Sequence, residues 1–402
     1  MFENLNVALY VTGSIAAYKS LMFTRLLVKA GANVRVLMTD GARQFIQPLS
    51  FQALAKHDVI TTDTDGMHAD QITHIELAQW TQLAIMMPAD ANTIAKVANG
   101  LADNEVTTTW LATSAPKVVV PAMNDQMLAN PATQRNIDTL KHDGVTLIDP
   151  TVGFLAEGYQ AKGRMAEPED VLAQVELMLI KLNPDAPLKH RKILVTAGGT
   201  RQPLDPVRFI TNSSSGKMGI AIAKAAQRMG ADVTLIAADV KIALPLGMRI
   251  VRVTTSAELC STVLKLMPEN DGLIMTAAVA DFEPITVADH KIKKQQQSGE
   301  FTLQFREATD ILKAVAKIKR PDQFTVGFAA ETNDLKANAA KKLADKGLDL
   351  LVANDVSNPK IGFSSDDNQV TFLRPHAAPI QTPVLPKAAI AERLMQLVVD
   401  LK

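Results

Sequence analysis

Apolar residues in the middle of the chain form a short continuous run, and small polar residues follow it. The run is Ile193-Leu194-Val195, and the glycine turn Gly198-Gly199 comes soon after it. A continuous apolar run of this length is typical of a strand that is buried on both faces of a parallel sheet. After a polar loop, apolar residues return at helical spacing from Met218 to Met229. The pattern therefore predicts a strand, a turn and a helix at the start of an α/β unit.

The same pattern occurs at the beginning of the chain. Residues 7–11 form an apolar run, Thr12-Gly13-Ser14 make the turn, and a helical pattern follows from residue 15. In both halves a second apolar run comes after the helix, at residues 34–38 and 233–237. We therefore predict an α/β protein with two Rossmann-like domains, each built on a parallel sheet. The second half carries an inserted loop between its turn and its helix.

A short polar segment rich in proline separates the two halves. Residues 183–187 read Asn-Pro-Asp-Ala-Pro, which is typical of a linker, and a predicted helix at 168–182 precedes them. We place the first domain at residues 1–183, the linker at 184–190 and the second domain at 191–402. The length of 402 residues fits two domains, since a domain usually has roughly 100–200 residues.

Polar residues and prolines follow the other predicted strands. Residues 83–87 are followed by Pro88 to Thr93, and residues 118–120 are followed by Pro121 to Asn124. In open α/β sheets, ligands bind at the carboxyl ends of the strands. The serines and glycine at 213–216 also precede a helix, and the amino end of a helix attracts anions. The pattern therefore predicts a phosphate site in each half.

Two common nucleotide motifs do not occur at these turns. Neither turn contains the GxGxxG dinucleotide fingerprint, and neither is a P-loop of the form GxxxxGK[ST]. Asp40 and Asp239 do follow the second strand of each half, where a ribose-binding acid would lie in a nicotinamide-dependent oxidoreductase. That interpretation stays open as an alternative, and it predicts a protein without a flavin.

Composition narrows the classes of function. The formal net charge is zero, so no field of the whole chain favours nucleic acid or a membrane surface. Cys260 is the single cysteine, which excludes an intrachain disulfide and a cysteine-based metal site. No apolar run reaches the roughly 18 residues of a membrane helix, and the first residues lack the pattern of a secretion signal. We expect a cytoplasmic protein that acts on small molecules.

Motifs along the whole chain resemble those of one family. In the first half they are TGSIAAYK at 12–19, HIEL at 74–77, PADANTI at 88–94, GLADN at 100–104, PAMNDQM at 121–127 and GRM at 163–165. In the second half they are TAGGTRQPLDPVRFITNSSSGKMG at 196–219, AAVADF at 277–282, KIKK at 291–294, GFAAETN at 327–333 and ANDV at 353–356. With these motifs the chain resembles the bacterial bifunctional phosphopantothenoylcysteine decarboxylase / phosphopantothenate–cysteine ligases of coenzyme A biosynthesis.

The first half resembles the flavin-containing cysteine decarboxylases, which implies a flavodoxin-like fold and FMN as the cofactor. The resemblance implies that backbone donors at Gly13 and Ser14 hold the FMN phosphate. It places three further residues near the flavin: Ala89, Asn92 and Thr93. It implies His74 as the catalytic base and Asn124 as the residue that binds the carboxylate leaving as CO₂. Met127 and Arg164 match substrate-binding positions.

The second half resembles the ligase, which implies that CTP activates phosphopantothenate as an acyl-cytidylate before the amine of cysteine displaces CMP. Mg²⁺ is implied with the nucleotide. Asn212 matches the residue that steadies the acyl-cytidylate, and the nucleotide positions are matched by Ala277, Asp281, Lys291, Ile311, Phe328, Lys342 and Lys346. Without the resemblance, such lysines would be read as a solvated face. The resemblance also implies homo-oligomers through both domains, with decarboxylase sites between subunits.

One position departs from the family pattern. The family has a cysteine in the glycine-rich flap that gives a proton to the enethiol intermediate, and this chain has Glu157 there. Glu157 could replace that acid, because desolvation under an apolar flap would keep a carboxyl group protonated near neutral pH. Alternatively, the second half-reaction is lost and the first domain is an arrested or non-catalytic flavin-binding module beside an active ligase. A third alternative is that Glu157 is simply exposed.

Overall fold

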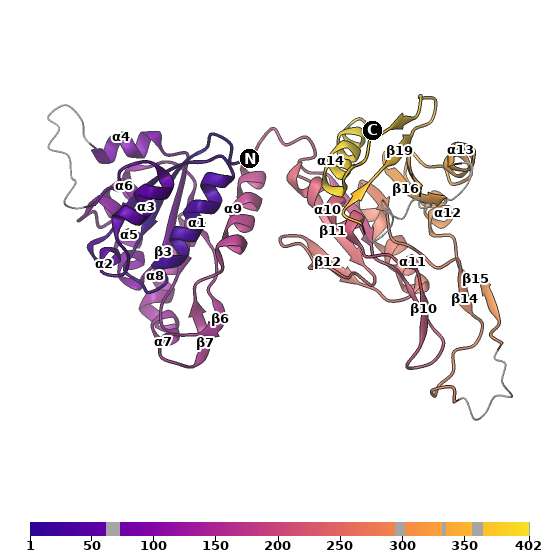
Figure 1. Ribbon diagram of the computed structural model, residues 1–402, viewed down its shortest axis with the longest axis horizontal. Helices are drawn as coiled ribbons and strands as arrows, with labels where there is room; N and C mark the ends of the chain where they lie inside the picture. Colours follow the sequence, from indigo (N-terminus) through magenta and orange to yellow (C-terminus); the bar gives the residue numbers. More distant parts are fainter. Residues whose placement is uncertain (62–72, 294–301, 332–334, 356–364, 402) are drawn as a thin grey trace. The chain divides into compact units, whose positions relative to one another are not determined.

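The computed structural model describes residues 1–61, 73–293, 302–331, 335–355 and 365–401. Four residues at the ends of the quoted motifs, Lys294, Thr332, Asn333 and Val356, lie outside the described residues. The chain forms two compact units, unit 1 at Met1–Leu179 and unit 2 at Ile180–Lys402 (Figure 1). Among the described residues, every helix is too short or too polar to span a membrane.

Unit 1 is built on a parallel sheet of five strands in the order β2-β1-β3-β4-β5. The strands are β1 Asn6–Val11, β2 Asn33–Met38, β3 Leu83–Ala89, β4 Lys117–Pro121 and β5 Thr146–Leu147. All seven residues of β3 are buried, as expected for a strand covered on both faces. The predicted flavodoxin-like parallel fold is confirmed in this unit.

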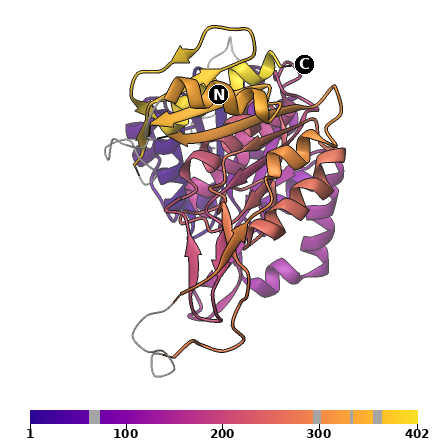
Figure 2. The same ribbon diagram turned by 90° about the vertical axis from the view of Figure 1, so that its right-hand side faces the viewer.

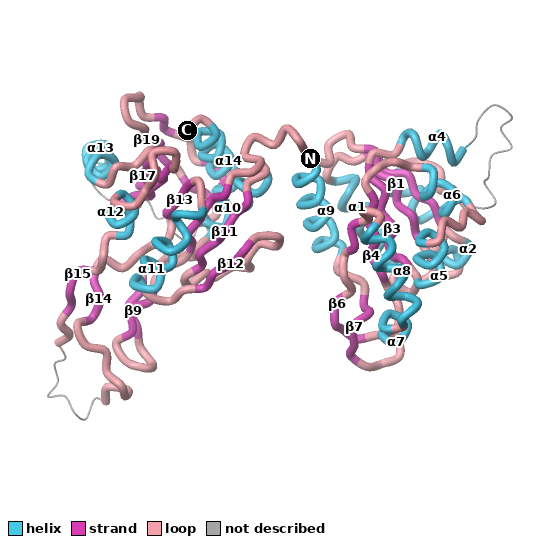
Figure 3. The backbone as a smooth tube through the Cα atoms, turned by 180° about the vertical axis from the view of Figure 1, so that it is seen from behind, coloured by secondary structure: helices cyan, strands magenta, loops and turns pink. Residues whose placement is uncertain are grey.

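Helices cover both faces of this sheet (Figure 3). On one face Phe23, Phe51 and Val171 pack into the core; they belong to α1 Ala17–Lys29, α3 Pro48–Ala55 and α9 Pro168–Leu182. On the other face Leu77, Ile94, Trp110 and Ile137 pack into a second core; they belong to α4 Thr73–Trp80, α5 Ala91–Ala98, α6 Glu105–Ala112 and α8 Pro131–His142. Two short helices, α2 Asp40–Arg43 and α7 Asp125–Ala129, follow β2 and β4.

The glycine-rich segment before α9 is a hairpin of two antiparallel strands, β6 Thr151–Phe154 and β7 Gln160–Arg164. We call this element the flap. Gly158 lies in its turn with a φ of 88°, a left-handed conformation that glycine adopts readily. A Cβ atom at Gly163 would lie 2.2 Å from the carbonyl oxygen of Met123. The flap therefore touches the segment that follows β4 at a distance that a larger residue would not allow.

Unit 2 is built on a sheet of eight strands in the order β12-β11-β8-β13-β16-β17-β19-β20. The parallel strands are β8 Lys192–Ala197, β11 Asp232–Ala237, β12 Arg249–Arg252, β13 Gly272–Met275, β16 Phe324–Glu331 and β17 Leu350–Asp355. Two antiparallel strands, β19 Val370–Leu373 and β20 Ile380–Gln381, extend one edge. The predicted parallel sheet is confirmed, and this antiparallel edge was not predicted.

Helices also cover both faces of the second sheet. Ile222 and Leu394 pack on one face, from α10 Lys217–Arg228 and α14 Lys387–Val399. Val263 and Val315 pack on the other face, from α11 Ser256–Leu266 and α12 Ile311–Ala316, with α13 Leu335–Asp345 beside them. A 3₁₀ helix, Met267–Glu269, follows α11.

The inserted loop of unit 2 is itself a hairpin, β9 Arg201–Pro203 with β10 Phe209–Thr211. A second pair, β14 Phe282–Pro284 with β15 Phe305–Glu307, also leaves the main sheet (Figure 2). A small pair, β18 Asp367–Asn368 with β21 Leu385–Pro386, lies near the start of α14.

In each sheet there is one strand at which the order of the following strands reverses, so that the chain continues on the other side of it. β1 lies between β2 and β3, and β8 lies between β11 and β13. The connections leave such a strand toward opposite sides, which opens a crevice at its carboxyl end where ligands bind. Gly13 follows β1 after Thr12, and Gly198 follows β8 directly. The two turns predicted to hold phosphate therefore lie at the two crevices.

Candidate active sites

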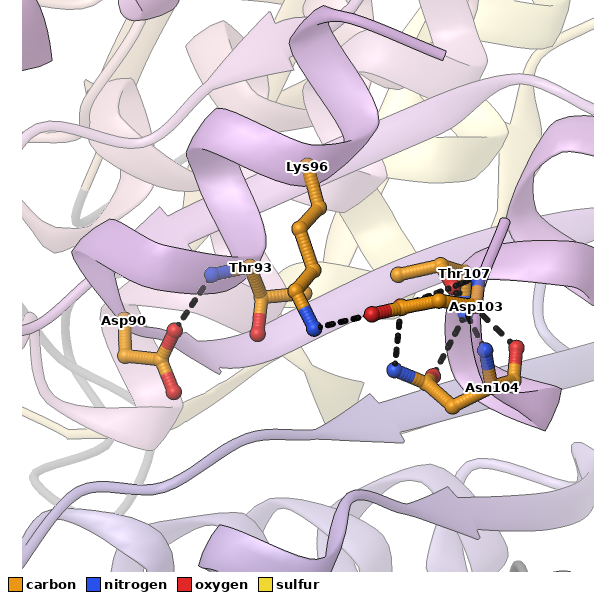
Figure 4. Close-up of polar contacts among 6 residues, drawn as sticks. All are labelled: Asp90, Thr93, Lys96, Asp103, Asn104 and Thr107. Carbon is orange, nitrogen blue, oxygen red and sulfur yellow. Dashed lines mark hydrogen bonds and ion pairs between the residues drawn. The ribbon is translucent and has the colours of Figure 1, made fainter. Parts of the chain in front are cut away.

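The first candidate site lies where β1 and β3 end. Gly13 N donates to Asp90 Oδ2 at 2.9 Å, and Thr93 N donates to Asp90 Oδ1 at 2.6 Å, so Asp90 is the N-cap of α5 (Figure 4). In the described part of the chain, the backbone N–H groups of Ser14 and Ile15 have no hydrogen-bond partner. These two groups are available to a phosphate, whereas the N–H of Gly13 already has an acceptor.

The other predicted flavin-binding residues lie on the same segment. Ala89 is buried at the end of β3, Thr93 is buried in the first turn of α5, and Asn92 is exposed. At the other end of α5, Lys96 pairs with Asp103 at 2.7 Å, and Asn104 and Thr107 form the capping box of α6 (Figure 4). The PADANTI and GLADN motifs thus hold both ends of the helix whose first turn lies beside Gly13.

The flap brings Glu157 to Asn124. Asn124 Nδ2 donates to Glu157 Oε1 at 2.8 Å and to the Tyr159 hydroxyl at 3.1 Å. The Tyr159 hydroxyl donates to Asp125 Oδ1 at 2.6 Å. That bond raises the pKa of Tyr159 and holds the pKa of Asp125 below its usual value. The structure therefore joins two of the predicted catalytic residues, and Tyr159 and Asp125, which the sequence did not single out, complete the contact.

Glu157 itself is exposed in the single chain. Phe154, on the same flap, is 64% exposed. The desolvation that the acid role of Glu157 requires is therefore not present in one chain alone. It would have to come from a bound substrate or from a second copy.

Two predicted substrate-binding residues lie near the flap. Met127, on α7, is 49% exposed. Arg164 Nη2 pairs with Glu167 Oε1 at 2.8 Å, and the same oxygen pairs with the buried Lys19 Nζ at 3.0 Å. The hydrogen bond from Lys19 is the main cause that lowers the pKa of Glu167. Lys19 also donates to the carbonyl oxygen of Met165 at 2.9 Å, so it connects α1 to the base of the flap.

His74 lies apart from these residues. It occupies the first turn of α4 and is half-buried. Within unit 1, α4 lies at one end and the flap lies at the opposite end (Figure 1). Across the described residues, no hydrogen bond joins His74 to Asn124 or Glu157. A single chain therefore does not bring the predicted base to the predicted carboxylate site.

The second candidate site is a cavity of about 760 Å³ at the carboxyl end of the unit 2 sheet. Most of the residues predicted for the ligase line it: Asn212, Ala277, Asp281, Ile311, Phe328, Lys342 and Lys346. The segment from Asn212 to Gly219 forms one wall, and Asn212 Nδ2 donates to the carbonyl oxygen of Val279 at 3.0 Å. Gly219 is required there, because a Cβ atom would lie 2.6 Å from Ala197 Cβ.

Lys291 is the predicted residue that the structure does not bring to this cavity. It is exposed and does not belong to the lining. Its neighbour Ile292 is fixed to the loop between β9 and β10, since Ile292 N donates to Asp205 Oδ2 at 3.2 Å and Arg208 Nη2 donates to the Ile292 carbonyl oxygen at 2.8 Å. Lys291 therefore lies on a segment held by the hairpin, outside the cavity.

Lysines on two sides of the cavity have carboxylate partners. Lys346 Nζ lies 3.3 Å from Asp310 Oδ2, and Lys217 Nζ lies 2.7 Å from Asp366 Oδ1. An anionic ligand would compete with these carboxylates for the ammonium groups. The lining contains five lysines but only three carboxylates, so the charge of the cavity wall suits a polyanion.

Two further lining residues were missed at the sequence level. Lys387 is buried at the first position of α14, where burial and then the charge of Lys217 lower its pKa. A lysine at that position opposes the helix dipole, which is a signal that the sequence offered. Asn354 Oδ1 is buried and has no hydrogen-bond partner in the part of the chain that the structure describes. A donor on a ligand would satisfy it.

Acidic side chains are the possible protein ligands for Mg²⁺. No group of three or more His, Cys, Asp or Glu residues that could hold an ion occurs in the described ranges. The carboxylates that line the cavity are Asp281, Glu307 and Asp310. Mg²⁺ usually needs only one or two carboxylates when substrate phosphates supply other ligands. The cavity thus fits an ion that arrives with a nucleotide and does not provide a separate cage.

Family models match both halves of the chain. A flavoprotein family matches residues 1–179, and the DNA/pantothenate metabolism flavoprotein C-terminal domain matches residues 188–401. The C-terminal domain of a coenzyme A biosynthesis bifunctional protein CoaBC is a similar solved structure, with a TM-score of 0.46 and 35% identity, and it covers 54% of this chain and 97% of that chain.

Curated relatives match nearly the whole chain. The Bacillus subtilis protein named coenzyme A biosynthesis bifunctional protein CoaBC is 45% identical over 98% of this chain and 97% of its own length. The Vibrio cholerae protein of that name is 43% identical over the same shares. A protein named cysteine/cysteine sulfinic acid decarboxylase, from an unknown prokaryotic organism, is 41% identical over 82% of this chain and 91% of its own length. The chain therefore belongs to the CoaBC family of bifunctional coenzyme A biosynthesis proteins and carries both of its domains.

Proposed function

We propose that this chain catalyses two steps of coenzyme A biosynthesis. Unit 2 joins 4′-phosphopantothenate to cysteine with CTP, and unit 1 decarboxylates the 4′-phosphopantothenoylcysteine product with FMN to give 4′-phosphopantetheine. The observation that carries the proposal is the pair of crevices, one at the end of β1 and one at the end of β8, in a chain related to CoaBC over 98% of its length. The order of the unit 1 strands is the one in which FMN binds between the first and third strands.

In the ligase reaction, the substrate carboxylate attacks the α-phosphorus of CTP, and pyrophosphate leaves. The amine of cysteine then attacks the acyl carbon, and CMP leaves. Lys342 and Lys346 would contact the triphosphate, since both line the cavity. Cations that neutralise charge on transferring phosphates supply much of the catalysis in such reactions. Mg²⁺ would enter with CTP and could use a lining carboxylate such as Asp281.

Asn212 would act on the activated acyl group. Its amide is fixed by the bond to Val279, so it is held at the wall of the cavity. An amide donor at this point can stabilise negative charge on the acyl-phosphate oxygens.

In the decarboxylase reaction, FMN supplies a two-electron oxidation of the cysteine moiety and later returns the electrons. The N–H groups of Ser14 and Ile15 would bind its phosphate at the amino end of α1. Asn124 would donate its amide hydrogen to the carboxylate that leaves as CO₂, and Met127 and Arg164 would contact the substrate. Glu157 would give a proton to the enethiol after CO₂ has left.

A second copy of the chain is part of this proposal. His74 would serve as the base, yet α4, the helix that carries it, lies at the opposite end of unit 1 from the flap (Figure 1). The flap also exposes Val152 and Phe154, which are 70% and 64% exposed. In a homo-oligomer the His74 of one copy could approach the flap of another. Such an assembly would bring the base to the carboxylate site and would also cover the exposed apolar residues of the flap.

The experiment is to purify the chain, record its visible spectrum, and assay pyrophosphate release with phosphopantothenate, cysteine and CTP. We expect a yellow protein that releases pyrophosphate only when CTP and phosphopantothenate are both present. A colourless, folded preparation that takes up no added FMN would overturn the flavin assignment.

A further inference from the structure

Asp90 contacts two separate elements at the end of the unit 1 sheet. Its Oδ1 accepts from Thr93 N at 2.6 Å in the first turn of α5, and its Oδ2 accepts from Gly13 N at 2.9 Å in the turn after β1. The residue is half-buried and follows β3 directly. Each carboxylate oxygen thus holds one of the two segments that border the crevice.

Thr12 makes the return contacts between the same segments. The N–H of Asp90 donates to Thr12 Oγ1 at 2.8 Å, and the Thr12 hydroxyl donates to the Pro88 carbonyl oxygen at 2.8 Å. Thr12 is fully buried. The end of β1 and the end of β3 are therefore joined by bonds that run in both directions, and Asp90 takes part in two of them.

The geometry limits which groups remain for a ligand. A Cβ atom at Gly13 would lie 3.2 Å from the backbone carbon of Gly41, so the turn is closely packed. Because Asp90 uses the N–H of Gly13, the donors left at this turn are those of Ser14 and Ile15, among the residues that the structure describes.

We propose that Asp90 is a positioning residue for FMN. It fixes the turn at Gly13 against the start of α5, and this sets the direction of the Ser14 and Ile15 donors relative to Asn92 and Thr93. The inference rests on the proposed placement of the FMN phosphate at this turn. Asp90 itself does not touch the phosphate.

The chemistry of the side chain makes this proposal testable. A carboxylate close to a bound phosphate repels it. If the hydrogen bonds of Asp90 to Gly13 and Thr93 had no effect on the site, a neutral residue at position 90 should therefore improve FMN binding. Asparagine has one acceptor oxygen, so it can serve Thr93 or Gly13 but presents an NH₂ group to the other N–H. Serine can cap α5 but is too short to reach Gly13 as well.

The test compares Asp90→Asn and Asp90→Ser with Asn130→Ser. Asn130 caps α8 in the same unit through Ala132 N at 2.9 Å, so Asn130→Ser is a matched exchange of a helix cap outside the crevice. Two quantities are measured for each apoprotein: the Kd of added FMN from quenching of flavin fluorescence, and the thermal midpoint without FMN. We expect both Asp90 variants to bind FMN roughly two- to tenfold more weakly, as for the loss of one hydrogen bond. We expect Asn130→Ser to bind it normally.

Asp90→Ser should keep a thermal midpoint close to that of Asn130→Ser, because both variants retain a cap. Equal or tighter FMN binding by Asp90→Ser would overturn the role of Asp90. Ser14→Asp tests the placement separately, since it adds a negative charge at the turn. Unchanged FMN binding by Ser14→Asp would show that the phosphate lies elsewhere, which removes the proposed placement together with this inference.

Discussion

Asn124 Nδ2 donates a hydrogen bond of 2.8 Å to Glu157 Oε1. The amide that we propose for the substrate carboxylate is thus already bound to a carboxylate of the flap. One amide NH₂ group that also contacts Tyr159 at 3.1 Å cannot serve two carboxylates in the same place. We expect the substrate carboxylate to displace Glu157, because two carboxylates on one amide group would repel each other, and Glu157 can return beside the reacting carbon once CO₂ has left.

The variant Glu157→Gln distinguishes the hydrogen bond with Asn124 from the donation of a proton to the enethiol. A glutamine oxygen can still accept from Asn124, but its amide is not an acid. We expect this variant to release CO₂ while the oxidised enethiol accumulates, and we expect Glu157→Cys to restore the reduced product. The ratio of phosphopantetheine to CO₂ is the quantity to measure. A wild-type ratio for Glu157→Gln would show that Glu157 is not the proton donor.

Lys342→Gln should weaken CTP binding, because the triphosphate would lose a cation of the cavity wall. A charge-assisted contact of this kind is equivalent to roughly tenfold to a hundredfold in binding. Lys291→Gln should also lose most ligase activity if the segment after β14 moves to the nucleotide. The KM for CTP is compared between the two variants, with thermal unfolding of the purified chain as the control for folding. Normal kinetics of Lys291→Gln alongside a defective Lys342→Gln would place Lys291 in a solvated run.

Asn212→Asp should impair the ligase after CTP has bound, since a carboxylate would repel the acyl-cytidylate. It would also repel the Val279 carbonyl oxygen that now accepts from the amide. Asn212→Ala is therefore the companion variant, because it removes the donor without adding charge. We expect both variants to slow product formation more than they slow pyrophosphate exchange. Wild-type rates of both steps in Asn212→Ala would exclude a role for the amide.

Glu167→Gln should make the stability of unit 1 less dependent on pH in acid. Lys19 lowers the pKa of Glu167, so the ionised pair adds stability above the usual glutamate value of about 4.3, and that stability is lost as the pH falls through the lowered value. The Glu167 side chain is 45% exposed, so screening limits the effect to about 1 kcal/mol or less. Thermal midpoints at pH 7 and pH 3 are compared; a difference between wild type and variant that persists at pH 3 would contradict this account.

The sequence predicted the sheets well, because buried parallel strands leave continuous apolar runs. β8 and α9 lie where the pattern placed them. The antiparallel strands β19 and β20 were missed for different reasons. β19 is buried but has only four residues, with Thr371 among the apolar ones, whereas β20 has two exposed residues and leaves no apolar run. The inserted loop was recognised as extra, but its hairpin form was not, as β10 is exposed at all three residues.

The residues of the candidate sites also fall into two groups, those that the sequence could place and those that it could not. Residues in the polar segments that follow a strand, such as Asn124 after β4 and Asp281 after β13, can be placed from the sequence because the carboxyl end of the strand positions those segments. Lys387 was missed because its contact with the cavity depends on α14 packing beside α10, far away in the sequence. The approach of His74 to a flap could not be predicted from the sequence either, because we propose that this flap belongs to a second copy of the chain.

The most direct test of the central claim uses cysteine labelled at its carboxyl carbon. The purified chain is incubated with labelled cysteine, CTP, Mg²⁺ and phosphopantothenate, and labelled CO₂ is collected. We predict that labelled CO₂ appears only when CTP and phosphopantothenate are both present, in step with phosphopantetheine. Label that stays in phosphopantothenoylcysteine, or labelled CO₂ released from cysteine without CTP, would contradict a chain that ligates first and decarboxylates second.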